Sequence, residues 1–337
     1  MRENFNYRSL CNILYGALAI IFCATITVCY AIQINEGDIW FHLAYGRYFL
    51  EHNVLSLDHS IFSWTPAKSD VPYCNWISEI FFYFLYKLGG VSAFFYLRYI
   101  FIFIFMLFAF SFIKKTRIEY APFILLILLS GLLMAFSGIR IKPEIFSFLY
   151  MTVMVWTWFK IKTSPDRGHL LCYIFPVILL AWVNSHGGFI FGVAFLGSVL
   201  AGEMINRFTD SKEMVNHRTR MHLFVSIALS VFACFVTPYG WEYPAQLVND
   251  LVLNSKGFTQ DAQTIMEFQS IFHPGARRFH FIEYLVLFTA ILVLLHIPYL
   301  RRHKPDWSLI VPNLLFIALY MKYLRTTYFW AIIIVFS

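Results

Sequence analysis

Long apolar segments recur along most of this chain, separated by short polar connections. A stretch of 18 or more apolar residues is long enough to cross the hydrocarbon core of a bilayer as a helix. The composition agrees, because hydrophobic residues make up 59% of the 337 residues and charged residues only 13%. Soluble domains carry about 25% charged residues. The sequence therefore predicts an all-α polytopic membrane protein.

We expect about ten transmembrane helices in a single transmembrane domain that covers residues 1–337. The first apolar segment is too long for a signal peptide, so we expect it to remain as an uncleaved anchor. The last is still apolar at Ser337, which favours a truncated chain whose natural form continues further. The expected spans are near 11–33, 91–113, 119–137, 144–161, 169–184, 188–205, 221–237, 281–299, 307–321 and from about 326 onward.

Basic residues indicate the orientation, because Lys and Arg are enriched in cytoplasmic loops. With the N-terminus in the cytoplasm, more than half of the 26 Lys and Arg residues lie in short inner segments. Extracytoplasmic loops are then expected at 34–90 and 238–280. Residues 34–75 carry two basic and five acidic side chains, as an outer loop should. The basic pI is therefore explained by membrane topology and does not indicate nucleic acid binding.

The segment 76–88 is apolar but too short to cross a bilayer, so we expect it to lie in the membrane interface. Counting it as a span would place the acidic first loop and the basic turn at 114–117 on the same side. The six cysteines form no CxxC or Cys/His metal spacing. Only Cys74 lies in an outer loop, so no disulfide can form within a loop.

The first outer loop opens with two carboxylates, Glu36 and Asp38. They could hold one divalent cation such as Mg or Mn, or one of them could act as a general base. His42 and Gly46 follow Asp38 at intervals of four, so on a helix the three share one face, where Gly permits close approach. The alternative is an amphipathic interfacial helix with His42 at the headgroup level.

Two cations, Arg140 and Lys142, lie at the second outer turn. They could clamp a lipid-linked phosphate, for which Arg is the better bidentate partner. The alternative is that both side chains reach to lipid headgroups. A third cation, Arg98, lies inside a predicted span and needs an anionic partner. Glu79, an outer-loop acid or a bound donor could supply it.

Three further outer segments carry candidate substrate ligands. Asn184 and His186 lie in a turn whose glycines are needed for its tight geometry, which is a sufficient structural reason for the motif. The two side chains could also donate hydrogen bonds to a phosphate or sugar. Tyr239 and Trp241 suit the aromatic belt at a membrane interface, and they would equally form a stacking platform for a sugar. Glu267 lies in the second long loop and adds a carboxylate.

The order of these motifs resembles bacterial membrane proteins of the GT-C glycosyltransferase superfamily, in the branch similar to protein mannosyltransferases. The resemblance covers most of residues 30–270. It rests on Asp38-Ile39-Trp40-Phe41-His42-Leu43, Gly46-Arg47, Leu57-Asp58, Phe62-Ser63-Trp64-Thr65, Trp76, Glu79, Arg140-Ile141-Lys142-Pro143-Glu144, Trp182-Val183-Asn184-Ser185-His186-Gly187-Gly188 and Thr237-Pro238-Tyr239-Gly240-Trp241.

The resemblance implies a GT-C-like bundle in a bacterial inner membrane with a helical first outer loop. It implies an inverting transfer of sugar from a polyprenyl-phosphate or polyprenyl-pyrophosphate carrier to a protein, lipid or polysaccharide acceptor outside the cytoplasm. The catalytic acid of the family falls on Asp38, with Glu36 beside it. Arg140 and Lys142, with His186, are then expected to stabilise the departing phosphate.

Three other functions fit the same sequence. A transporter or flippase for lipid-linked glycans would need polar groups at the bilayer midplane and broken helices in corresponding halves. A polymerase similar to those of O-antigen would join lipid-linked sugars with related chemistry. An assembly subunit would use the aromatic outer loops to bind a partner.

Overall fold

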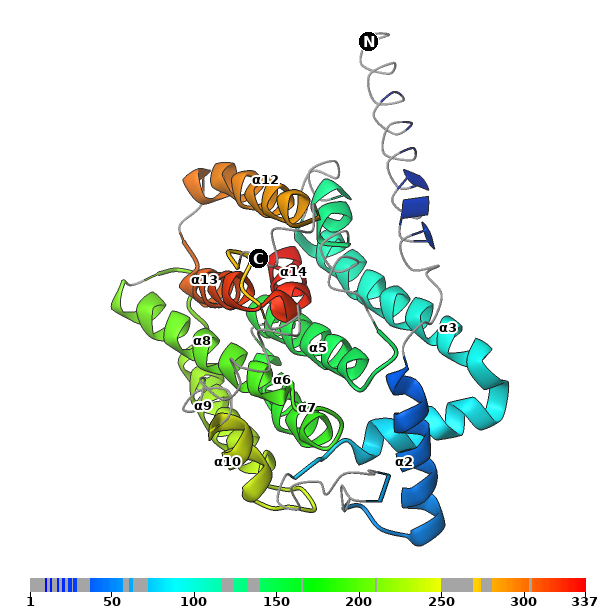
Figure 1. Cartoon of the computed structure of the whole chain (residues 1–337). Helices are drawn as coiled ribbons and strands as arrows, with labels where there is room; N and C mark the ends of the chain where they lie inside the picture. The colour runs from blue at the N-terminus through cyan, green and yellow to red at the C-terminus, as the bar shows by residue number, and fades with distance from the viewer. Residues whose placement is uncertain are drawn as a thin grey trace.

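The fold was analysed in a computed structural model of the whole chain (Figure 1). Isolated positions between 10 and 28 are described, and each of them is helical. Beyond them, the structure describes residues 37–56, 61–62, 72–116, 124–131, 140–164, 166–209, 211–249, 269–273, 281–302 and 305–337. Within these residues the regular structure is entirely helical, which confirms the all-α part of the predicted class.

The helices match most of the predicted apolar segments closely. Residues 124–131 are also helical and fall within the predicted segment 119–137. The named elements are α2 (Asp38–His52), α3 (Trp76–Thr116), α5 (Glu144–Thr163), α6 (Gly168–Leu171), α7 (Ile174–Val183), α8 (Phe189–Phe208), α9 (His217–Ala233), α10 (Glu242–Val248), α12 (Phe281–Arg302), α13 (Trp307–Lys322), the 3-10 turn η4 (Leu324–Thr326) and α14 (Thr327–Val335).

Fewer helices than expected meet the length and composition of a membrane span. In the described part of the chain, two do so, Trp76–Phe112 and Phe189–Phe208. Other apolar helices, such as Trp307–Lys322, are shorter. Most of the predicted first span, 11–33, falls outside the described residues. Helix length and composition therefore support two crossings here and leave the ten-span bundle a prediction.

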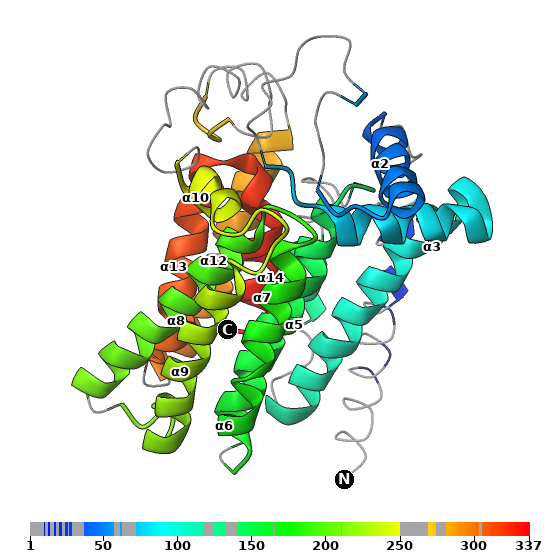
Figure 2. The same cartoon turned by 90° about the horizontal axis from the view of Figure 1, so that it is seen from below.

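Helix α3 bends at Gly90, where φ is +61° and ψ is −151°. A positive φ is accessible to glycine because it has no Cβ. The bend separates a first arm, 76–89, from a second arm, 91–116, and in Figure 2 the first arm passes below α2 before the chain turns along the bundle. The bend falls where the sequence analysis separated segment 76–88 from the span that follows.

Two groups of polar contacts define opposite ends of the bundle. At the Glu144 end, the carboxylate of Glu144 pairs with Arg325 Nε at 3.1 Å, which joins α5 to η4. At the Lys162 end, Lys162 Nζ lies 3.0 Å from Glu203 and 2.9 Å from Asp306, which joins α5 to the end of α8 and the start of α13. Figure 2 shows α2 and α10 at one end and α6 at the other.

The helix directions follow from these contacts. Helices α5, α8 and α14 run away from the Glu144 end, whereas α7 and α13 run towards it. Between the two ends α5 is packed with apolar side chains, including Phe148, Met151 and Met154, each at most 2% exposed. Its 20 residues correspond to a length of about 30 Å.

Helices α8 and α13 pack with almost no separation at Gly202. A Cβ at this position would lie 2.3 Å from the backbone carbonyl oxygen of Trp307.

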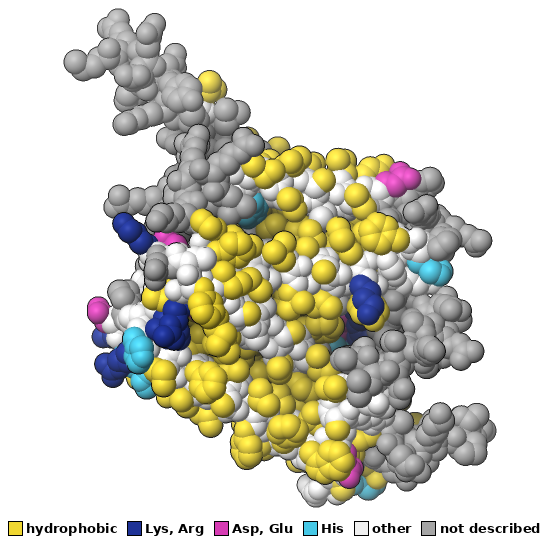
Figure 3. Space-filling model, turned by 90° about the vertical axis from the view of Figure 1, so that its left-hand side faces the viewer, with side chains coloured by type: hydrophobic (Ala, Val, Ile, Leu, Met, Phe, Trp, Pro, Cys, Tyr) yellow, Lys and Arg dark blue, Asp and Glu magenta, His cyan; other side chains and the backbone are white. Residues whose placement is uncertain are grey.

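On the outside of the bundle, large apolar side chains are exposed. Hydrophobic groups cover much of the face in Figure 3, with few charged groups among them. Along the second arm of α3 they recur every three or four residues, at Tyr96, Ile100, Phe103, Leu107 and Phe110.

Candidate functional site

Helix α2 carries Asp38 and His42 to the Glu144 end by docking on the first arm of α3. The contact is close at Gly46, where a Cβ would lie 2.1 Å from the backbone carbonyl oxygen of Glu79. Any larger residue at position 46 would have to push the two helices apart. The predicted helical face of Asp38, His42 and Gly46 is therefore present, and its glycine serves close helix packing.

Asp38 pairs with Lys142, one of the two cations predicted at the second outer turn. Lys142 Nζ lies 2.5 Å from Asp38 Oδ2, and the Asp38 side chain is 57% exposed. The hydrogen bond from Lys142 lowers the pKa of Asp38; slight burial opposes this, and the charges of Lys142, His42 and Arg140 add to it. Asp38 is therefore ionised at neutral pH. The carboxylate predicted in the first outer loop and the cation predicted at the second outer turn belong to the same site.

His42 faces a buried carboxyl group. Its Nδ1 lies 2.9 Å from Glu79 Oε1, and the hydroxyl of Tyr73 donates to the same oxygen at 3.0 Å. Glu79 is fully buried, and its Oε2 has no hydrogen-bond partner among the described residues. Burial and the negative charge of Glu79 raise the pKa of Tyr73 well above its usual value, so its hydroxyl remains a donor.

His186 belongs to a third group, which the sequence analysis only partly predicted. Ser147 Oγ lies 2.7 Å from His186 Nδ1, and the backbone N–H of Gly188 donates to that nitrogen at 3.1 Å. Arg325 Nη2 lies 3.5 Å from His186 Nε2 and also binds Glu144. Burial, with the charge of Arg325, lowers the pKa of His186 to about 3, and Glu144 opposes this only in part.

The three groups form one set of charges at the Glu144 end. The charges of His42 and Lys142 both reach His186, and those of His42 and Arg140 reach Asp38. Sequence reasoning did not assign Glu144 or Arg325 to the site and did not identify Glu79 as the partner of His42. We call the set the Asp38 cluster; it comprises Asp38, His42, Glu79, Arg140, Lys142, Glu144, His186 and Arg325.

Asn184 serves the fold. Its Oδ1 accepts from Trp76 Nε1 at 2.9 Å, and its Nδ2 donates to the carbonyl oxygens of Leu180 and Val236, each at 2.9 Å. These contacts connect the start of α3, the end of α7 and the segment after α9. The amide is thus used inside the protein, in place of the predicted contact to a substrate.

The remaining predicted residues lie at several depths. Tyr239 is half-buried and packs against the core, whereas Trp241 is 67% exposed. Arg98 is 5% exposed within α3, and its candidate partner Glu79 hydrogen-bonds His42 and Tyr73. Glu36 and Glu267 lie outside the described residues.

A divalent cation would have to compete for its ligands here. In the described part of the chain, no group of three or more His, Cys, Asp or Glu side chains is arranged to hold a metal ion. The one described carboxylate of the predicted pair, Asp38, already binds the ammonium group of Lys142. The described residues therefore do not fit a metal site.

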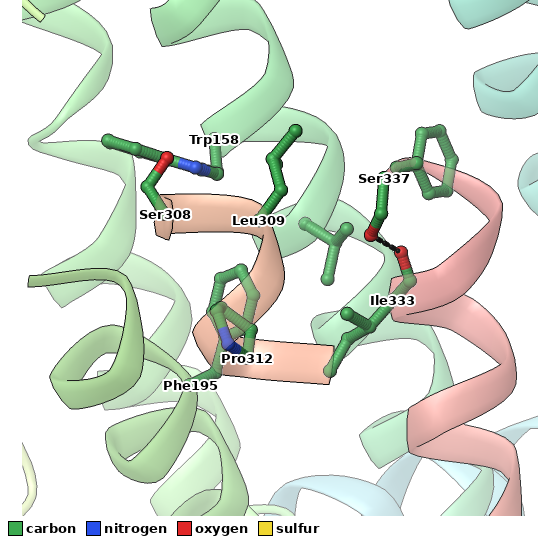
Figure 4. A pocket seen from close by; sticks show the side chains of 9 residues that line it. Trp158, Phe195, Ser308, Leu309, Pro312, Ile333 and Ser337 are labelled. Carbon is green, nitrogen blue, oxygen red and sulfur yellow. Dashed lines mark hydrogen bonds between the residues drawn. The ribbon is translucent and has the colours of Figure 1, made fainter. Parts of the chain in front are cut away.

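An apolar cavity lies elsewhere, between α5, α8, α13 and α14 (Figure 4). Its lining includes Trp158, Phe195 and Pro312, and Ser337 Oγ donates to the carbonyl oxygen of Ile333 at 2.7 Å. Trp158 follows Glu144 by 14 residues on α5, which corresponds to about 21 Å. The cavity therefore belongs to the helix packing and is separate from the Asp38 cluster.

Comparisons with known proteins found no relative of this chain. No protein-family model matches it, and neither a curated protein nor a solved structure shows significant similarity.

Proposed function

We propose that this chain is a polytopic membrane protein with the Glu144 end on the extracytoplasmic side. The length of α5, about 30 Å, equals the thickness of the hydrocarbon core, and the polar contacts lie at its two ends. Exposed apolar side chains on several helices suit contact with lipid. Cytoplasmic loops are rich in Lys and Arg. The connections and adjoining helix ends at the Lys162 end carry Arg167, Arg207, Lys212, Arg218 and Arg220.

The function that this arrangement supports best is glycosyl transfer from a polyprenyl-phosphate or polyprenyl-pyrophosphate sugar, in the manner of the GT-C superfamily. The observation that carries the proposal is the pairing of Asp38 with Lys142 beside Arg140 at one end of an apolar bundle. A lipid-linked phosphate would be held at the membrane boundary by the cations, and its sugar would lie near an ionised carboxylate.

The proposed reaction is a direct displacement that inverts the anomeric carbon. The acceptor hydroxyl binds Asp38 and passes its proton to the carboxylate as the new carbon–oxygen bond forms. The bond between the anomeric carbon and the phosphate oxygen breaks, and the polyprenyl phosphate leaves with the electron pair. Lys142 and Arg140 stabilise the charge on this leaving group. The donor phosphate thereby takes Lys142 from Asp38, which frees the carboxylate as the base.

A transporter is the less favoured function, because the ion pairs that join the described helices of the bundle lie at its two ends. Transport requires polar groups along a path across the membrane. The middle of α5 instead contributes Met151, Met154 and Val155 to the core, each at most 5% exposed.

The test is sugar transfer from a radiolabelled polyprenyl-phosphate donor by the protein in lipid vesicles. Asp38→Asn keeps the size of the side chain and removes the base, so transfer should fall roughly 10²–10⁴-fold. Asp166→Asn, an exposed position at the Lys162 end, is the matched control and should keep full activity. Full transfer by Asp38→Asn would refute the assignment of the base.

A further inference from the structure

The contacts of Glu79 restrict the protonation of His42. Glu79 Oε1 receives the hydroxyl proton of Tyr73 at 3.0 Å and lies 2.9 Å from His42 Nδ1. The Tyr73 hydroxyl also lies 3.3 Å from His42 Nδ1, but this contact is longer than its bond to Glu79, so Glu79 is its preferred acceptor. An oxygen that accepts one hydrogen bond can accept a second, so the proton between Glu79 and His42 is best placed on Nδ1. A neutral imidazole with a proton on Nδ1 keeps a lone pair on Nε2. No hydrogen bond joins Nε2 to another described residue.

His42 lies close to Asp38, the proposed base. It follows Asp38 by four residues on α2, so the two side chains lie on the same helical face one turn apart. The charged and titratable groups around it are Asp38 on its own helix, Glu79 and Tyr73 beside α2, and His186 across the site. The pKa of Asp38 is lowered by the hydrogen bond from Lys142, so its carboxylate holds a proton only weakly and passes it on readily.

We propose that Glu79 is a positioning residue that holds His42 with its proton on Nδ1, so that Nε2 collects the proton that the acceptor hydroxyl has passed to Asp38. The source of this proton rests on the transfer reaction proposed above. The imidazolium ion formed is stabilised by the Glu79 carboxylate and then releases the proton to water. Asp38 returns to its ionised state, ready for the next acceptor.

Because Glu79 is buried, a change at this position distinguishes the positioning role from a role in stability. A fully buried carboxyl group with one unpaired oxygen is unfavourable for folding. Glu79→Gln keeps the shape and can still accept from His42 Nδ1 through its amide oxygen, but it removes the negative charge. A residue kept only for stability would unfold the protein when changed, whereas this variant should keep or raise the unfolding temperature.

The kinetic arm compares wild type with Glu79→Gln and the control Glu51→Gln, which changes an exposed carboxylate on α2. We expect Glu79→Gln to lower kcat roughly 100-fold with little change in KM for the donor, and to alter the pH profile of kcat. Glu51→Gln should match wild type. Wild-type kcat and an unchanged pH profile in a folded Glu79→Gln protein would show that the Glu79 charge does not assist proton transfer through His42, and would overturn the proposal.

The spectroscopic arm does not depend on activity. In protein labelled with 15N-histidine, the signal of His42 is identified by its loss in His42→Asn. It should report a proton on Nδ1 in wild type and a loss of that preference in Glu79→Leu, which removes the accepting oxygen. A proton on Nε2 in neutral wild-type His42 overturns the inference. A proton on Nδ1 together with no sugar transfer by wild type upholds the positioning contact and refutes the proposed reaction.

Discussion

Opposite charges balance one another within the Asp38 cluster. Asp38 is paired with Lys142 and Glu144 with Arg325, so these two cations each lie beside a carboxylate. His186 lies between these pairs and is kept neutral by burial and by the charge of Arg325. A phosphate that enters the site can therefore replace a carboxylate as the partner of a cation already in position.

Neutral His186 makes stability depend on pH. Its pKa is about 3 in the folded protein and 6.5 in its ordinary state, so the unfolded chain binds more protons between these values. The free energy of unfolding should therefore fall as the pH drops from about 6.5 towards 3, by an amount on the order of 1–2 kcal/mol at pH 5. Thermal unfolding at pH 7.5 and pH 5 measures the loss. His186→Asn removes the titrating group, and an equal loss in this variant would contradict the assignment.

The sequence predicted part of this site from local patterns. Asp38, His42 and Lys142 are recognisable because each lies next to an apolar segment in a region rich in polar residues. The pairing of Glu144 with Arg325 joins residues 181 positions apart, and no local pattern reports such a contact. Asn184 shows a different limit of local patterns. A polar residue in a glycine-containing turn has the same sequence pattern whether it binds a ligand or, as here, other helices.

Helix boundaries were more predictable than helix contacts, because an apolar segment is a property of one stretch of sequence. Gly202 illustrates the difference, since its close approach to Trp307 on α13 depends on how two distant helices pack. Gly197, on the same helix, is exposed, with no atom within 4 Å of an added Cβ. These two glycines of α8 therefore separate packing from backbone preference.

Gly202→Ala should lower the free energy of unfolding by roughly 1–3 kcal/mol through overpacking. Gly197→Ala should raise it by about 0.5–1 kcal/mol, because alanine favours the helix over glycine. Thermal unfolding of both variants in the same detergent provides the comparison. Equal midpoints would show that α8 and α13 do not approach as closely as described.

The Lys162 end gives a second test of helix contacts. Lys162 lies between Glu203, which is fully buried, and Asp306. Lys162→Met leaves a buried carboxylate without its cation and should cost roughly 3–5 kcal/mol of unfolding free energy. Adding Glu203→Gln should recover part of this loss. If the double variant is no more stable than the single one, the pair does not connect α5 and α8 in this way.

At the scale of the whole molecule, the proposed topology places Trp241 outside the cell and Glu213 in the cytoplasm. Both positions are exposed. In a background with every cysteine changed to serine, Trp241→Cys should react with a membrane-impermeant maleimide on intact cells. Glu213→Cys should react only after the membrane is permeabilised. Labelling of both positions on intact cells, or the reverse pattern, would contradict the orientation.

The central claim is that the cations of the Asp38 cluster receive a lipid-linked phosphate at the extracytoplasmic end of the bundle. The most direct measurement is a cryo-electron microscopy map of the protein in a lipid nanodisc with a polyprenyl-phosphate sugar. The phosphate is predicted within hydrogen-bond distance of Lys142 and Arg140, with the sugar beside Asp38. Phosphate density at the Lys162 end, or an Asp38 cluster that stays empty at saturating donor, would contradict the claim.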